Sequence, residues 1–128
     1  NIETVKTLTK KVRKQNIYER SLMVLKYFSD RGIITKSGFM LGLGEKEEDI
    51  LSTIDDLLNV NCKILTIGQY LQPNKNLLPV VEYVSPEKFH RYKEIAISKG
   101  FLYVESGPFV RSSYNSKYQL NYIKNIWK

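Results

Sequence analysis

The chain has 128 residues, of which 42% are hydrophobic and 26% charged, and its formal net charge at pH 7 is +7. This length allows one hydrophobic core of ordinary size. No apolar run approaches the ~20 residues that a membrane-spanning helix needs, so we expect no membrane partner. The lysines are scattered, without zinc-ligand spacing or an aromatic RNA-binding signature, so we expect no nucleic-acid partner. A single cysteine excludes a disulfide scaffold.

Apolar spacing predicts two helices before residue 33. The first extends from about Thr4 to Lys14 and is rich in lysine. The second ends at Arg31-Gly32, where a basic residue is followed by a helix-terminating glycine. Its apolar residues recur at three- and four-residue spacing, which places on one face Tyr18, Leu22, Leu25 and Phe28.

A strand is expected over residues 33–41, followed by a helix that begins among the carboxylates of Glu45 to Asp49. Negative side chains in a first helical turn interact favourably with the helix dipole. The next strand covers residues 63–68, where the run from Ile64 to Ile67 is apolar-rich without alternation, as in strands that parallel sheets bury on both faces. The inner face of the intervening helix would carry Ile50, Ile54, Leu57 and Leu58.

The connection from Tyr70 to Val84 contains prolines and asparagines, which disfavour regular structure. Ser85-Pro86 then combines a capping side chain with proline at the first helical position, and Gly100 ends that helix. A last strand is expected at residues 101–104, and residues 117–127 would form an amphipathic helix or tail. This alternation of helices and apolar strands predicts an α/β fold with parallel strands.

Glycines at the end of the first expected strand form the pattern Gly38-x-Met40-x-Gly42-x-x-Glu45. Glycine lets a ligand approach main chain that a Cβ atom would block. A tight strand-to-helix turn explains the same glycines without a ligand. Cys62 enters an apolar run, which is typical of a small buried hydrophobe. The single histidine, His90, is expected to be a surface or packing residue rather than a general base.

Four stretches of the chain together resemble one enzyme family. They are Asn1-Ile2-Glu3-Thr4, the glycine stretch from Gly38 to Glu45, Gly68-Gln69-Tyr70-Leu71-Gln72-Pro73, and Gly107-Pro108-Phe109-Val110-Arg111-Ser112-Ser113-Tyr114. In this order they resemble the C-terminal portion of lipoyl synthase, a radical S-adenosylmethionine (SAM) enzyme. The resemblance implies insertion of two sulfurs at C6 and C8 of an octanoyl-lysine on a lipoyl carrier domain, as part of lipoate biosynthesis.

The resemblance implies the C-terminal half of a partial (β/α)6 TIM-like barrel in residues 1–106 and a C-terminal extension in residues 107–128. It also implies SAM and two [4Fe–4S] clusters as cofactors. Such clusters are held by thiolates, and this chain has one cysteine. Because the chain begins at Asn1 with neither a methionine nor a leader, we expect a fragment whose missing part carries the cysteine motifs and which is inactive alone.

By the same resemblance, SAM contacts are distributed along the chain. Asn1 and Glu3 would bind its ribose, although Glu3 would equally serve as a carboxylate at a helix start. Arg13 and Ser21 would face the methionine end, where a guanidinium pairs with a carboxylate, and Arg20 competes with Arg13 for this role. The other implied SAM-binding residues are Lys36, Gly38, Gly42, Gln69, Tyr70 and Leu71. Tyr70 would equally serve as a core residue.

The resemblance gives the auxiliary [4Fe–4S] cluster a serine oxygen as its fourth ligand, from the motif that begins at Arg111. We assign this role to Ser113, with Ser112 as the second candidate. A serine ligand is chemically reasonable because metal charge lowers the pKa of a bound oxygen acid. Without the family pattern, these adjacent serines would be interpreted as turn residues.

The implied partners are octanoylated lipoyl carrier domains, namely 2-oxoacid dehydrogenase E2 subunits and the glycine cleavage H protein, together with an electron donor such as ferredoxin or flavodoxin. A basic surface would suit an acidic carrier. The implied location is the cytoplasm of a bacterium, or the mitochondrial matrix or plastid stroma of a eukaryote. Two alternatives stay open: a biotin synthase-like radical SAM enzyme, which shares the glycine pattern but lacks Arg-Ser-Ser-Tyr, and a non-catalytic carrier-interaction module.

Overall fold

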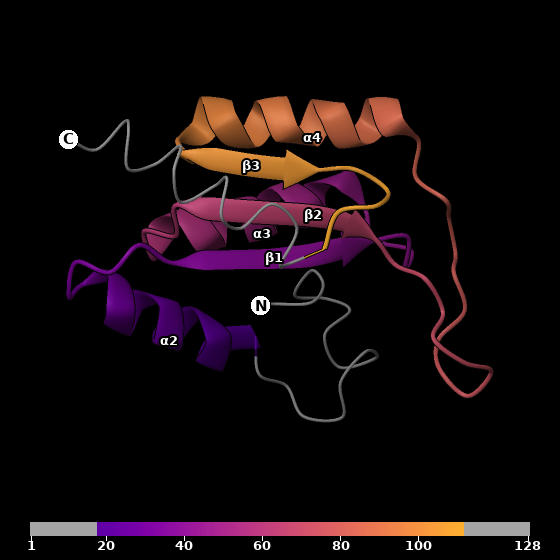
Figure 1. The fold of residues 1–128 in the computed structure, drawn as a ribbon, viewed down its shortest axis with the longest axis horizontal. Helices are drawn as coiled ribbons and strands as arrows, with labels where there is room; N and C mark the ends of the chain where they lie inside the picture. Colours follow the sequence, from indigo (N-terminus) through magenta and orange to yellow (C-terminus); the bar gives the residue numbers. More distant parts are fainter. Residues whose placement is uncertain (1–17, 112–128) are drawn as a thin grey trace.

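A computed structural model of the chain describes residues 18–111 (Figure 1). In this part of the chain, three parallel strands form one sheet in the order β1-β2-β3. The elements in chain order are α2 (Tyr18–Ser29), β1 (Lys36–Leu41), α3 (Glu47–Asn59), β2 (Ile64–Gln69), α4 (Pro86–Lys99) and β3 (Tyr103–Ser106). The predicted α/β class and parallel pairing are therefore confirmed. The elements expected near residues 4–14 and 117–127 lie outside the described residues.

Strand β2 occupies the centre of the sheet. It pairs with β1 from Lys36 opposite Ile64 to Leu41 opposite Gln69, and with β3 from Ile64 opposite Tyr103. All residues of β2 are buried. This confirms the prediction made from its apolar-rich run without alternation, because a central strand is covered on both faces.

The core lies between one face of the sheet and the helices. Alternate strand residues point to opposite faces, so Phe39, Leu65 and Val104 share the face that packs against α3 and α4. From the helices, the core receives Leu22, Ile50, Ile54, Leu57, Phe89, Tyr92 and Ala96. Tyr18 of α2 is also fully buried, and its hydroxyl donates to Asp56 Oδ2 on α3 at 2.7 Å.

The other side of the sheet carries two glycines and most of the polar strand residues. We call it the glycine face, and it consists of Lys36, Gly38, Met40, Ile64, Thr66, Gly68, Tyr103 and Glu105. A strand residue on this face alternates with one that faces the helices. The glycine face therefore points away from α3 and α4.

Several predicted boundaries are wrong by a few residues. Strand β1 begins at Lys36 rather than Ile33, and Ile33 is exposed. Strand β3 begins at Tyr103 because Phe101 directly follows Gly100 at the C-terminus of α4, and its amide still donates to the Ala96 carbonyl. Phe101 is nevertheless buried in the core, so its apolar character fits a loop as well as a strand.

The ends of α4 agree with the prediction. Ser85 Oγ accepts a hydrogen bond from the Lys88 amide at 3.3 Å, Pro86 occupies the first turn, and Gly100 follows the last turn with a φ of 129°. The connection between β2 and α4 contains no helix or strand. Among residues 18–111, no helix is long and apolar enough to cross a membrane.

Candidate functional site

The carboxyl ends of the three strands lie along one edge of the sheet because the strands are parallel (Figure 1). Strand β1 leads into the turn from Gly42 to Glu45, β2 leads into the connection that starts at Tyr70, and β3 leads into the segment from Gly107 to Arg111. We call this edge the carboxyl edge. Ligands of parallel α/β proteins commonly bind at such an edge.

The turn after β1 is closed by a side chain that we expected in a helix. The Glu45 carboxylate accepts hydrogen bonds from the amides of Gly42 at 2.6 Å and Leu43 at 2.9 Å. Glu45 therefore precedes α3, which begins at Glu47, and the prediction that it belongs to the first helical turn is wrong. Each of these two hydrogen bonds is charge-assisted. The Glu45 carboxylate therefore stabilises the turn more than it would stabilise the helix by interacting with the helix dipole.

Gln69 holds the distal half of the long connection against the end of β2. Its side chain is 3% exposed, and its amide nitrogen donates to the carbonyls of Tyr70 at 2.9 Å and Glu82 at 3.0 Å. Its amide oxygen accepts from the Val84 amide at 2.9 Å. The side-chain amide is thus engaged with main chain on both its donor and acceptor sides. Its direct role is to fix residues 82–84.

Gly42 is required by this same arrangement. Its carbonyl accepts from the amides of Val81 at 2.8 Å and Glu82 at 3.2 Å. A Cβ atom at Gly42 would lie 2.3 Å from Gln69 Nε2 and 2.6 Å from the Glu82 carbonyl oxygen, and its φ of 109° is one that other residues rarely adopt. The contacts with the connection therefore explain the glycine at position 42 without a ligand. This agrees with the alternative, given in the sequence analysis, that the glycines form a tight strand-to-helix turn.

Tyr70 and Leu71 differ in their surroundings although they are adjacent. Tyr70 is 7% exposed, and its hydroxyl donates to the Leu78 carbonyl at 2.6 Å. This contact favours the alternative that Tyr70 packs as a structural residue. Leu71 is 49% exposed at the carboxyl edge, so its side chain is accessible.

Gly38 lies on the glycine face in contact with the neighbouring strand. A Cβ atom there would come within 2.0 Å of Thr66 Oγ1, so the close approach is made by Thr66. Lys36 begins β1 and is therefore at the opposite edge from Gly42, roughly 20 Å away at the usual rise per residue of a strand. Burial lowers the pKa of Lys36, and the nearby Glu105 carboxylate opposes that shift.

The structure thus brings together Gly42, Gln69, Tyr70 and Leu71 at the carboxyl edge, and it separates Lys36 from them. Ser21 is half-buried on α2. The sequence also did not predict that Glu105 on the glycine face would accept a hydrogen bond from the Tyr103 hydroxyl. The remaining predicted site residues lie outside the described part of the chain, namely Asn1, Glu3, Arg13, Ser112 and Ser113.

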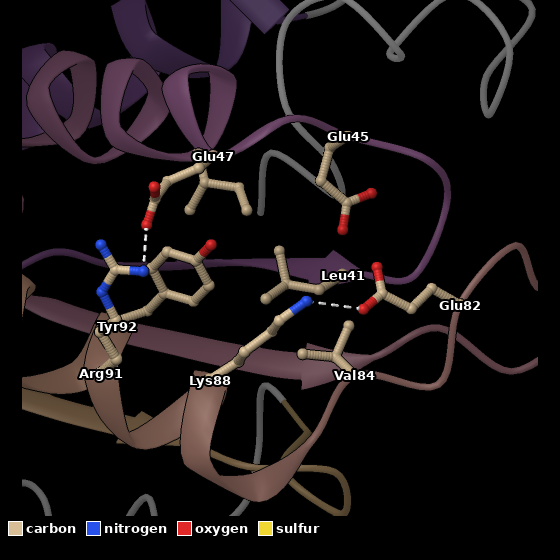
Figure 2. Close-up of a pocket in the computed structure, with 9 residues that line it drawn as sticks. Leu41, Glu45, Glu47, Glu82, Val84, Lys88, Arg91 and Tyr92 are labelled. Carbon is tan, nitrogen blue, oxygen red and sulfur yellow. Dashed lines mark hydrogen bonds and ion pairs between the residues drawn. The ribbon is translucent and has the colours of Figure 1, made fainter.

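A separate cavity of about 200 Å³ lies between α3 and α4, beside the end of β1 (Figure 2). Figure 2 shows that its basic groups are paired: Lys88 Nζ lies 2.9 Å from Glu82 Oε2, and Arg91 Nη1 lies 2.7 Å from Glu47 Oε1. The Tyr92 ring completes the lining, and burial raises the pKa of its hydroxyl. This cavity is on the helix side of the sheet, away from the glycine face.

Curated proteins with similar sequences share one name. The chain is 54% identical over 117 residues to a lipoyl synthase of Treponema denticola, covering 91% of the chain and 40% of that protein. It is 57% identical over 118 residues to a mitochondrial lipoyl synthase of Nematostella vectensis, with coverage of 91% and 40%. The chain is homologous to the lipoyl synthases. It spans about 40% of the length of these relatives and matches their C-terminal portion. No protein-family model matches the chain.

Among residues 18–111, no three histidine, cysteine or acidic side chains gather in a way that could bind a metal ion. Cys62, the single cysteine of this lipoyl synthase homologue, is fully buried, and burial raises the pKa of its thiol to about 11. The prediction that Cys62 is a small buried hydrophobe is confirmed.

The single histidine, His90, lies in the second turn of α4. Its side chain is exposed on α4, and Nε2 lies 2.9 Å from Glu94 Oε1 one helical turn further along. The expected surface role of His90 is therefore confirmed. A hydrolase based on a histidine general base gains no support from this position.

Proposed function

We propose that this chain forms the C-terminal part of a lipoyl synthase, which inserts two sulfur atoms at C6 and C8 of an octanoyl group on a carrier lysine. The observation that carries the proposal is the identity of 54% over 117 residues to a lipoyl synthase, which covers 91% of the chain. The four stretches that resemble the family extend from Asn1 to Tyr114, so the similarity is not confined to the sheet.

We also propose that the described sheet is half of a partial (β/α)6 barrel formed by residues 1–106, with residues 107–128 as an extension. Parallel strands with helices on one face support this arrangement, because a (β/α) barrel has its helices outside and its other face inside. The glycine face would then line the interior. The exposed side chains of Met23 and Tyr27 on α2 would be covered by a neighbouring β/α unit.

For SAM, we propose a site at the carboxyl edge. Asn1 and Glu3 would hold the ribose, and Arg13 and Ser21 would face the methionine end, as the family resemblance implies. Near the adenine we place main chain around Gly38 and Gly42, with the side chains of Tyr70 and Leu71. Gln69 would act indirectly, because its amide already holds residues 82–84. Lys36 lies at the opposite edge, and we leave it out of this set.

For the two [4Fe–4S] clusters, this chain would supply a serine oxygen, Ser113 or, as the second candidate, Ser112. The cysteine ligands would come from outside the chain, because its one cysteine is buried in the core. When bound, SAM and one cluster would supply radical chemistry, and the auxiliary cluster would supply sulfur. The role of the protein is to bind these groups and orient the octanoyl chain.

The proposed partners are octanoylated carrier domains, namely dehydrogenase E2 subunits and the glycine cleavage H protein, with ferredoxin or flavodoxin as electron donor. The net charge of +7 supports an acidic carrier, because complementary charge accelerates encounter. Relatives carry the name lipoyl synthase in bacteria and mitochondrial lipoyl synthase in an animal. We accordingly propose the cytoplasm for a bacterial source and the mitochondrial matrix or plastid stroma for a eukaryotic one.

The test is lipoyl formation by the full-length protein that contains this chain. The clusters are reconstituted, and octanoylated H protein, SAM and a reductant are added, after which mass spectrometry measures the carrier. We expect the mass of a lipoyl group to appear. An octanoyl carrier that stays unchanged, although both clusters are present and SAM is bound, contradicts the proposed activity.

The serine ligand is tested separately with Ser113→Ala and Ser112→Ala. We expect Ser113→Ala to lose lipoyl formation and to alter the spectrum of the auxiliary cluster. We expect Ser112→Ala to form lipoyl groups and to keep the wild-type cluster spectrum. The opposite pattern assigns the ligand to Ser112. If neither variant changes the cluster spectrum, the motif holds no cluster ligand.

A further inference from the structure

After β3, the chain turns back over the carboxyl edge of the sheet. The Gly107 amide donates to the Ile67 carbonyl of β2 at 3.0 Å, and the Val110 amide donates to the Gly107 carbonyl at 3.2 Å. In Figure 1 this segment leaves β3 and returns across the sheet towards β1. Val110 is 7% exposed whereas Phe109 is 86% exposed, so Val110 faces the protein and Phe109 faces away from it.

Gly68 is the point on β2 where this returning segment rests. A Cβ atom at Gly68 would lie 2.3 Å from the Val110 carbonyl oxygen and 3.3 Å from its carbonyl carbon. It would also lie 3.4 Å from Arg111 Nη1. The clash at 2.3 Å is with backbone, which cannot rotate aside as the end of a long side chain can.

The backbone conformation does not explain this glycine. The glycines with positive φ in the described chain are Gly32, Gly42, Gly44 and Gly100, so Gly68 has a conformation that other residues tolerate. What Gly68 provides is space on the glycine face. That space is filled by the main chain of Val110, which directly precedes Arg111 and the two serines.

The start of the segment is also anchored, which limits how far it could move to admit a side chain. Ser106 Oγ donates to the Phe89 carbonyl of α4 at 2.7 Å, which fixes the end of β3. Arg111 Nη1 donates to the Val110 carbonyl at 2.7 Å. The Val110 carbonyl and the Arg111 guanidinium that donates to it therefore both lie against Gly68.

We infer that Gly68 is a positioning residue, whose missing side chain lets the Val110 carbonyl rest on β2 and so determines where the chain enters Arg111-Ser112-Ser113-Tyr114. The effect on the auxiliary cluster rests on the proposed function, whereas the effect on residues 107–111 does not. Gly68 acts through main chain and touches no reacting atom.

The first test measures amide hydrogen exchange in the full-length protein with Gly68→Ala. We expect the hydrogen-bonded amides of Gly107 and Val110 to exchange about tenfold faster than in the wild type, because the alanine methyl group displaces the Val110 carbonyl and favours local opening. The matched control is Gly107→Ala. Its Cβ would lie 3.7 Å from Val110 Cγ2, an ordinary contact, so we expect the exchange of this segment to stay within about twofold.

Unchanged exchange at the Gly107 and Val110 amides overturns the inference. Faster exchange throughout β1 and β2 also overturns it, because Gly68 would then maintain the sheet rather than the segment. If Gly68→Ala does not fold, Val110→Ala removes the buried side chain from the segment without altering the sheet. The same local increase is expected there, and its absence contradicts the inference.

The second test follows the auxiliary cluster. Gly68→Ala should alter its spectrum and reduce lipoyl formation at least tenfold, while calorimetry finds SAM affinity within about twofold of the wild type. A normal cluster spectrum despite local opening shows that Gly68 does not position the serine motif. Failure of the proposed function is distinguishable, because the wild-type protein itself would then form no lipoyl group while the exchange result could still hold.

Discussion

Replacement of Gln69 by alanine would distinguish a structural role of this side chain from a direct contact with a cofactor. The buried amide makes hydrogen bonds to Tyr70, Glu82 and Val84. A net contribution of about 1 kcal/mol for each bond gives a loss of about 3 kcal/mol in the free energy of unfolding. Val84 is buried, so its amide would lose its hydrogen-bond partner without gaining access to water. This cost of an unsatisfied buried donor supports a loss of at least this size.

The assay is thermal unfolding of the full-length protein without SAM. At about 2–4 °C per kcal/mol, a loss of 3 kcal/mol corresponds to a decrease in Tm of roughly 6–12 °C. Gln72→Ala is the matched control, because Gln72 is exposed and makes one hydrogen bond, to the Leu77 carbonyl at 2.9 Å. Its expected effect is below about 0.5 kcal/mol.

Equal Tm values for the two variants would refute the structural role of Gln69. If Gln69→Ala lowered SAM affinity with no change in Tm, Gln69 would instead contact the cofactor directly. A decrease in Tm that is the same with and without SAM supports the assignment made from the hydrogen bonds.

Three further predictions concern single residues. Gly42→Ala should lower the free energy of unfolding by about 2–4 kcal/mol in chemical denaturation. The control Gly44→Ala should lower it by about 1 kcal/mol, because its Cβ would meet nothing closer than 3.7 Å. Equal losses in the two variants would contradict the clash at Gly42. Burial raises the pKa of Cys62 from 9.0 to about 11, so stability present below pH 9 should fall by up to about 1.4 kcal/mol per pH unit between these values. Cys62→Ala should lack this decrease in urea unfolding at pH 8 and pH 10, and an identical pH dependence would argue against it. His90→Ala should change the free energy of unfolding by at most about 0.5 kcal/mol, because its pair with Glu94 is exposed, and a loss above 1.5 kcal/mol would reveal a packing role.

Features that depend on local sequence were predicted well. The run from Ile64 to Ile67 indicated a buried central strand, and the structure confirms it. The cap at Ser85-Pro86 and the stop at Gly100 also follow from neighbouring residues, and both are confirmed. By contrast, the start of β3 was misplaced because Phe101 is apolar for packing reasons alone.

Contacts between distant segments could not be predicted from periodicity. Gln69 bonds to Glu82 and Val84, which lie 13 and 15 residues further along in a connection without regular structure. The reason for glycine at position 68 likewise depends on Val110, which lies 42 residues further along the chain, after α4 and β3. The assignments of Asn1, Glu3, Arg13 and Ser113 lie outside the described residues and stay predictions.

The connection between β2 and α4 has consequences for how lipoyl synthase-like chains can change in length. From Leu78 onwards, its main chain is bonded to Tyr70, Gly42 and Gln69. Residues 73–76, in contrast, are exposed at its tip. Extra residues at the tip would break the exposed hydrogen bond from the Asn76 amide to Asn74 Oδ1 and would otherwise cost the slow increase in loop-closure entropy with length. An insertion after residue 80 would shift the register of the bonds to Gly42 and Gln69. Natural length variation in this connection should therefore accumulate before Leu78, and a reporter peptide is best inserted between Asn74 and Asn76.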